Sequence, residues 1–82
     1  MKVAVDISLY PLNDEFLPPI QDVIRRLNQH DGIAVTTNPM STQVRGDYDV
    51  VMPILSAEIR QTFQNVPKAV FAIRILNNPI GD

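Results

Sequence analysis

The chain has 82 residues, with seven basic and nine acidic side chains and a net charge of −2. This length allows one compact domain, and the charge argues against a nucleic-acid-binding protein, which would usually carry a basic stripe. There is no cysteine and only one histidine. Disulfide scaffolds, thiol catalysis and cysteine-based metal centres are therefore excluded, and we expect no metal and no cofactor.

Membrane insertion and secretion are not expected from the sequence. No apolar run approaches the roughly 20 residues that a membrane-spanning helix needs. Asp6 lies where a signal peptide would require an apolar stretch. The sequence therefore predicts a cytoplasmic protein without a membrane partner.

Residues 2–10 alternate between apolar and more polar side chains, which predicts a strand. One face carries Val3, Val5, Ile7 and Leu9. The other face carries Ala4, Asp6, Ser8 and Tyr10. Pro11 should end the strand, because proline cannot donate to the ladder.

A helix should follow, with Pro19 in its first turn, where a missing N–H costs little. Its apolar positions recur at the spacing of one buried stripe, namely Ile20, Val23, Ile24 and Leu27. Asp31 and Gly32 offer a C-terminal stop, since glycine accepts the left-handed conformation there.

Residues 33–38 and 42–45 predict a hairpin, joined by the turn residues 38–41. A second helix should follow residues 46–49, with Asp47 or Asp49 as N-cap. Its expected buried stripe has four members, Val51, Leu55, Ile59 and Phe63. Pro53 must lie near the start of this helix, because an interior proline costs about 3 kcal/mol.

Residues 68–76 predict the last strand, which should end before a C-terminal tail, residues 78–82. One face holds Phe71, Ile73 and Ile75, and the other holds Val70, Ala72 and Arg74. The resulting order is β-α-β-β-α-β. It predicts an α+β, ferredoxin-like domain over residues 1–77, with a four-stranded antiparallel sheet and both helices on one face.

This fold leaves one face of the sheet open. Its expected side chains mix small apolar groups with neutral polar ones, which is typical of a face that packs on a second sheet. We therefore expect a homodimer or homotetramer that assembles through the open face. Asp6 and Arg74 could alternatively just pair across neighbouring strands.

No catalytic constellation is evident, so we expect a protein that is not an enzyme. His30 falls at the polar end of the first helix and is expected as a bare surface residue. Asp47 and Asp49 resemble a catalytic pair but sit where helix caps belong. RNA recognition is excluded, since residues 42–45 lack the aromatic platforms of that domain.

Three short motifs stand out: residues 8–12 (Ser-Leu-Tyr-Pro-Leu), residues 37–42 (Thr-Asn-Pro-Met-Ser-Thr) and residues 46–49 (Gly-Asp-Tyr-Asp). In this order and spacing they resemble the YkoF-like thiamine-binding family. The resemblance extends from about Val3 to Ile75. It implies a single-domain member with the ferredoxin-like fold, sheet-to-sheet assembly, and binding of thiamine or its hydroxymethylpyrimidine moiety.

The matched motifs contain side chains suited to an aminopyrimidine, which needs fixed neutral hydrogen-bonding groups and a stacking surface. The neutral polar candidates are Ser8, Thr37, Asn38, Ser41 and Thr42. Tyr10 or Met40 could cover the ring, and Asp6 could oppose the thiazolium charge. Each also has an ordinary structural explanation, because turn and strand-end positions favour these residue types.

The sequence thus predicts a carrier or sensor linked to thiamine uptake or salvage. The alternative is a regulatory or scaffold module that oligomerises and binds another small metabolite. A third class is a small enzyme that uses the open sheet as its pocket.

Overall fold

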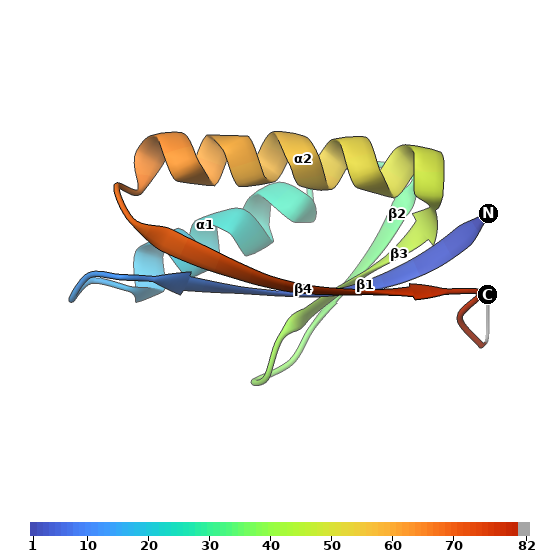
Figure 1. The fold of residues 1–82 in the computed structure, drawn as a ribbon, viewed down its shortest axis with the longest axis horizontal. Coiled ribbons are helices and arrows are strands. Elements are labelled where there is room, and N and C mark those ends of the chain that lie inside the picture. The colour runs from blue at the N-terminus through green and yellow to red at the C-terminus, as the bar shows by residue number, and fades with distance from the viewer. Residues whose placement is uncertain (81–82) are drawn as a thin grey trace.

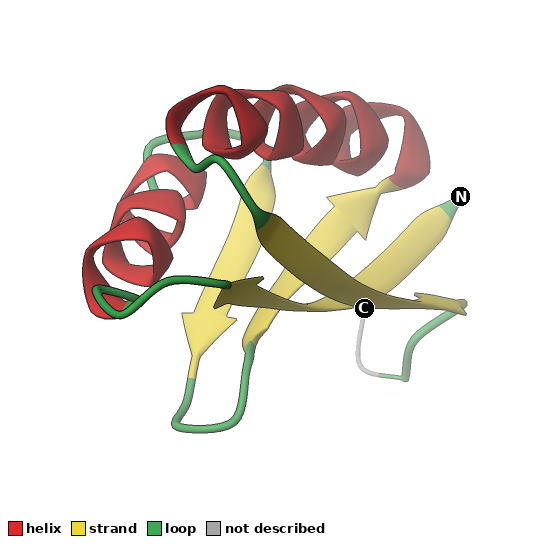
Figure 2. Ribbon diagram, turned by 60° about the vertical axis from the view of Figure 1, so that its left-hand side comes forward, coloured by secondary structure: helices red, strands yellow, loops and turns green. Residues whose placement is uncertain are grey.

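The computed structural model describes residues 1–80 (Figure 1). The elements in chain order are β1 (Lys2–Pro11), α1 (Leu17–Leu27), β2 (Ile33–Thr37), β3 (Thr42–Asp47), α2 (Tyr48–Asn65) and β4 (Ala69–Asn77). The strands form one antiparallel sheet of order β2-β3-β1-β4, and both helices cover the same face of it (Figure 2). The ferredoxin-like arrangement is confirmed. Gly81 and Asp82 of the expected tail lie outside the described residues.

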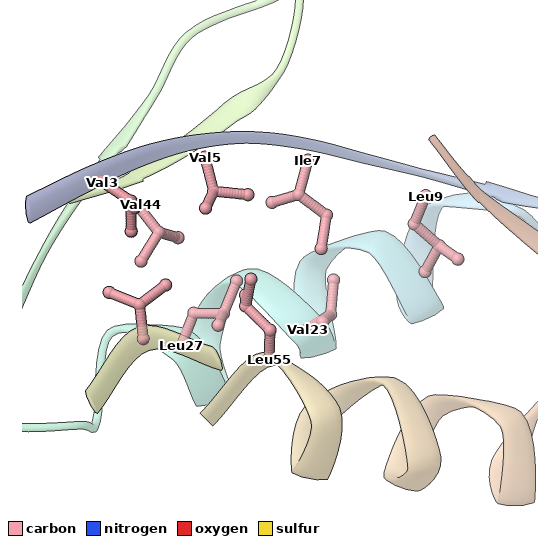
Figure 3. Packing of buried hydrophobic residues seen from close by; sticks show 9 residues of the cluster. Val3, Val5, Ile7, Leu9, Val23, Leu27, Val44 and Leu55 are labelled. Atoms are coloured by element: carbon pink, nitrogen blue, oxygen red, sulfur yellow. The ribbon is translucent and has the colours of Figure 1, made fainter. Parts of the chain in front are cut away.

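The central strand β1 supplies the floor of the core. Val3, Val5, Ile7 and Leu9 point toward the helices and are at most 6% exposed (Figure 3). The helices and β3 pack onto them with five buried residues: Val23, Leu27, Val44, Val51 and Leu55. The strict alternation in β1 therefore placed the buried face correctly.

Helix α1 begins at Leu17, so Pro18 and Pro19 both lie in its first turn, where their missing N–H groups leave no hydrogen bond unmade. The helix ends at Leu27, four residues before the expected stop. Gly32 lies in the following loop with φ of +82°, a conformation that favours glycine.

Helix α2 starts directly at the end of β3. Asp47 is the N-cap residue, although its side chain makes no capping hydrogen bond and instead lies 3.4 Å from the N-terminal amine of Met1. Pro53 therefore falls in the second turn, where it removes one main-chain bond to the carbonyl of Asp49. Of the two caps weighed from the sequence, Asp49 is excluded.

The expected position of Phe63 in the core is wrong. Phe63 is 50% exposed, and Thr62, only 2% exposed, occupies the buried position of that turn. Each step of four residues rotates around the helix by about 40° beyond a full turn, so Phe63 lies about 120° from Val51. The ring of Phe63 contacts that of Phe71, with the ring centroids 5.6 Å apart.

A polar cluster joins the two helices. The Arg26 guanidinium donates to the Glu58 carboxylate, to Thr62 Oγ1 at 2.7 Å and to Asp22 Oδ2 at 3.0 Å. His30 Nε2 lies 2.6 Å from the second oxygen of Glu58. The expectation that His30 is a bare surface residue is therefore wrong, since α2 brings Glu58 to it.

Candidate functional site

The end of β1 leaves a gap in the sheet. The ladder between β1 and β3 stops at the pair Ile7 and Thr42, whereas β1 continues to pair with β4 as far as Pro11. Within residues 1–80, β4 is therefore the only strand beside β1 beyond Ile7. Because main-chain groups alternate between the two sides of an antiparallel strand, those of Leu9 point toward the hairpin and not toward β4.

A cavity of about 350 Å³ occupies this gap. It lies between the end of β1, the β2–β3 hairpin and α1. Seven of the eight candidate ligand residues line it: Ser8, Tyr10, Thr37, Asn38, Met40, Ser41 and Thr42. Residues about 30 positions apart in the chain are thus gathered at one site.

The wall formed by α1 was not predicted from the sequence. Phe16, Ile20 and Ile24 line the cavity on this side, and Ile7 and Leu9 contribute from the core. The helical spacing of Ile20 and Ile24 identified a buried stripe, but it could not show that part of the stripe borders a space. Phe16, which is 54% exposed, carried no sequence signal beyond its apolar character.

The hairpin turn is held by Asn38. Its Oδ1 accepts hydrogen bonds from the main-chain N–H groups of Met40 at 2.8 Å and Ser41 at 3.1 Å. Its own N–H donates to the carbonyl of Ser41 at 3.0 Å. Asn38 therefore has a structural role through its oxygen, and only its side-chain NH₂ group is left to offer a ligand.

Four other lining residues differ in how firmly they are held and in how exposed they are. Thr37 Oγ1 and Thr42 Oγ1 lie 3.1 Å apart across the hairpin, and Thr42 is 5% exposed. Tyr10 and Met40 are 54% and 85% exposed and flank the cavity at the surface. The cavity therefore combines an apolar interior with hydroxyl groups and two exposed side chains at its rim.

Asp6 lies apart from this cavity, on the open face of the sheet. Its Oδ2 accepts from Arg74 Nη2 at 2.6 Å and Nε at 3.0 Å, which confirms the cross-strand pair. The Ser41 hydroxyl and the Arg74 guanidinium hold the pKa of the Asp6 carboxyl below its ordinary value, and burial opposes them. The buried Oδ1 of Asp6 has no hydrogen-bond partner among the described residues. The Ser41 hydroxyl therefore lies near the Asp6 carboxylate without a well-formed hydrogen bond to Oδ1.

The family of the chain follows from comparison with known proteins. The profile of thiamine-binding proteins matches residues 5–80, nearly the whole chain. The chain belongs to the thiamine-binding protein family. The resemblance read from the three motifs is thereby confirmed, and this membership supports a role connected with thiamine and with binding.

Solved structures share the fold of this thiamine-binding family member. A Streptococcus pneumoniae protein has a TM-score of 0.89 at 22% identity, covering 98% of this chain and 90% of its own. A Thermotoga maritima protein, proposed to act in thiamine biosynthesis or salvage, has a TM-score of 0.85 at 21% identity. The match covers 95% of this chain and 85% of that protein. A Methanocaldococcus jannascii protein has a TM-score of 0.82 at 22% identity, and the match covers 99% of this chain and 84% of that protein. A search of curated proteins found no match.

Two further features are absent from residues 1–80. No group of three or more histidine, aspartate or glutamate side chains in this range could hold a metal ion. Neither α1 nor α2 is long and apolar enough to cross a membrane.

Acidification should destabilise the fold partly through Asp6. Because its pKa is lower in the folded chain, its contribution is fully present above the unfolded pKa of about 3.9 and is lost as the pH falls through the folded pKa. Urea unfolding midpoints measured between about pH 6 and pH 3 should fall less for Asp6→Asn than for the unsubstituted chain. Equal losses in both proteins would contradict this, since Asp22 and Asp47, whose pKa values are also lowered, titrate in both.

Proposed function

We propose that this family member binds the aminopyrimidine part of thiamine in the cavity between β1, the hairpin and α1. The ligand would be thiamine or free hydroxymethylpyrimidine, bound without chemical change by a cytoplasmic carrier or sensor. The observation that carries the proposal is the gathering of Ser8, Tyr10 and residues 37–42 around one cavity in a chain of this family.

The size of the cavity suits a small ring. Its 350 Å³ lies near the lower end of the range of about 300–1,000 Å³ found for small-molecule sites. Phe16 and Ile20 offer apolar contact to a flat ring. A pyrimidine fits such a space, and the thiazolium of thiamine would extend toward the exposed side chains of Tyr10 and Met40.

The polar groups at the rim complement an aminopyrimidine. Its exocyclic amine needs an acceptor, and its ring nitrogens need donors. The Ser8 hydroxyl can serve either need, the Asn38 NH₂ can donate, and the outward N–H and C=O of Leu9 provide a fixed donor and acceptor side by side. Tyr10 could contact the thiazolium cation through its ring face. Asp6 is a weaker counter-charge than expected, because Arg74 already neutralises it.

Assembly through the open sheet face belongs to the same proposal. Tyr10 borders the cavity and is also a side chain of the open face. A second copy packed there would cover the exposed mouth and increase the burial of a ligand, which small-molecule sites require.

The first test is thermal unfolding with hydroxymethylpyrimidine and thiamine added in turn. A ligand at 100 times its dissociation constant stabilises the folded state by about 2.7 kcal/mol, or about 10–20 °C for a domain of this size. A stable oligomer that neither compound shifts would contradict the proposal and favour a scaffold module or another metabolite.

The second test uses variants with affinity as the readout. Ser8→Ala and Asn38→Asp each remove one neutral hydrogen-bonding group, and we expect each to weaken binding about 2- to 12-fold. Asn38→Asp retains the oxygen that holds the turn. Tyr10→Ala should cost more if its ring stacks on the ligand. His30→Ala, whose partner Glu58 is outside the cavity, should leave the affinity unchanged. Unchanged affinity in the first three, with the oligomer intact by light scattering, would place the site elsewhere.

A further inference from the structure

The mouth of the cavity is the place where related pyrimidine ligands differ most in charge. Thiamine carries its cationic thiazolium on the methylene group of the pyrimidine, and hydroxymethylpyrimidine carries a neutral hydroxyl on the same carbon. A phosphate ester of that hydroxyl has a charge of about −1.5 to −2 at pH 7. In the orientation proposed above, all three substituents leave the cavity between the exposed side chains of Tyr10 and Met40. The charge that this mouth accepts therefore decides which form of the ligand binds.

The lining of the cavity offers no cation to a phosphate. None of the described residues that line it is charged. The two arginines of the wall helix α1 bind other partners, since Arg25 pairs with Asp22 and Arg26 pairs with Glu58. A phosphate that moved out of water next to Phe16 would lose hydration without gaining an ion pair, which is costly.

The cations of the neighbouring strands also lie away from the mouth. Arg74 binds Asp6 on the open face. Arg45 pairs with β1 four residues before Ser8, about 13 Å along the strand. Lys68 precedes β4 and lies on that strand's side of β1, away from the hairpin. None of these three cations therefore lines the mouth.

The helix N-terminus beside the cavity lacks half of the donors that usually bind phosphate. Helix N-termini attract anions because their first four N–H groups have no partner within the helix. In α1 these positions are the N-cap Phe16 and the residues Leu17, Pro18 and Pro19. The two prolines have no N–H, so only two of the four donors remain. The first turn of α1 therefore suits an apolar ring better than an anion.

Two carboxylates lie between β1 and this helix. Asp14 and Glu15 are both exposed and directly precede Phe16 in the chain. At 3.8 Å per residue, the Cα atoms of Asp14 and Phe16 are at most about 7.6 Å apart, which is within the screening length of about 8 Å at physiological salt. These carboxylates repel an anion near Phe16 and attract a cation. The exposed ring of Tyr10 acts in the same direction, because the face of an aromatic ring attracts cations.

We propose that the mouth of this cavity selects by charge at the pyrimidine methylene, accepting a cation or a neutral group and rejecting a phosphate. This selection rests on the proposed function, since it requires that the pyrimidine occupy the cavity. The protein then handles thiamine and free hydroxymethylpyrimidine before phosphoryl transfer to the hydroxymethyl group. A reaction of that class must take the pyrimidine after its release from this protein.

Isothermal titration calorimetry tests the selection with hydroxymethylpyrimidine and thiamine, each with and without a phosphate ester. We expect the phosphate ester of hydroxymethylpyrimidine to bind at least about 10-fold more weakly than the free alcohol. Thiamine monophosphate is the matched control. Its phosphate lies beyond the thiazolium and outside the mouth, so its loss of affinity relative to thiamine should be smaller.

The outcomes of this titration separate the selection from the proposed function. If the phosphate ester of hydroxymethylpyrimidine binds as tightly as the free alcohol, or more tightly, the selection is overturned and the pyrimidine site stands. An equal loss for the two phosphate esters would overturn the selection as well, because total charge and not the mouth would then decide the affinity. Absence of binding by all four compounds would overturn the proposed function and the selection together.

The variant Met40→Lys should reverse part of the selection. Met40 is 85% exposed, so a lysine there adds a cation at the mouth without disturbing the core. At low salt we expect this variant to bind the phosphate ester of hydroxymethylpyrimidine about 3- to 5-fold more tightly, and thiamine more weakly, than the unsubstituted chain does. Gln61→Lys adds the same charge at an exposed position of α2 that does not line the cavity, and it should leave both affinities unchanged. Equal affinities in the two variants, whether changed or not, would overturn the proposal.

Discussion

Replacing Leu55 by alanine should lower the free energy of unfolding by about 2–5 kcal/mol. Leu55 is 2% exposed and lies in the core between α2, α1 and β1 (Figure 3). The substitution removes three carbon atoms from a close-packed interior that can only partly collapse into the space. A domain of this length is stable by only about 4–12 kcal/mol, so the variant should approach the limit of folding.

Urea unfolding followed by far-ultraviolet circular dichroism, at one fixed protein concentration, measures this loss. Leu17→Ala is the matched control, because it makes the same chemical change in a leucine that is 51% exposed at the start of α1. It should cost less than about 1 kcal/mol. Equal losses for the two leucines would show that the packing of α2 on the sheet does not determine stability.

Removing Arg26 should cost about 2–4 kcal/mol, and removing the adjacent Arg25 should cost less than about 1 kcal/mol. The Arg26 side chain is 12% exposed, and Arg26→Ala leaves the Glu58 carboxylate and the buried Thr62 hydroxyl without its donor groups. The Arg25 side chain is 59% exposed and, among the described residues, pairs only with Asp22, so water and salt replace its contact at little cost. Both variants remove one positive charge from the same helix. The change in net charge is therefore equal in the two, and it cannot explain a difference between them.

The contrast between the two arginines should persist in high salt. Screening weakens the exposed pair of Arg25 more than the enclosed contacts of Arg26. Urea midpoints of both variants at about 0.1 M and 1 M salt would measure this difference. A loss in Arg26→Ala that disappears at 1 M would indicate that its contacts act as an ordinary surface ion pair.

Periodicity predicted most of the fold because each pattern reports a local property. The alternation from Val3 to Leu9 requires only that one face of a strand be buried, and β1 meets that requirement. The position of Phe63 was mistaken because a stripe of i+4 steps drifts around a helix, and the straight path leads to Thr62. The boundary between β3 and α2 was misplaced because Gly46 and Asp47, residue types typical of turns, here continue the strand.

The candidate site was partly accessible from the sequence. The motifs around Ser8 and Asn38 pointed to segments that the strand order brings together, because β1 and β3 are neighbours. The contribution of α1 was not accessible, since whether Ile20 borders a space or a side chain depends on how far β1 extends past β3. The partnership of His30 with Glu58 likewise depends on the packing of the two helices, which no local pattern encodes.

The central place of β1 determines the order in which the sheet can form. β2 and β3 are joined by a four-residue turn and can pair early, whereas Val3 must find Asn77 near the other end of the chain. The entropy of closing that loop is lost before the ladder begins to compensate for it, which makes this step slow. Until β4 arrives, β1, the strand that supplies the floor of the core, has an open edge. We therefore expect the yield of refolding to depend on the concentration of partly folded chains more than on the stability of the finished domain.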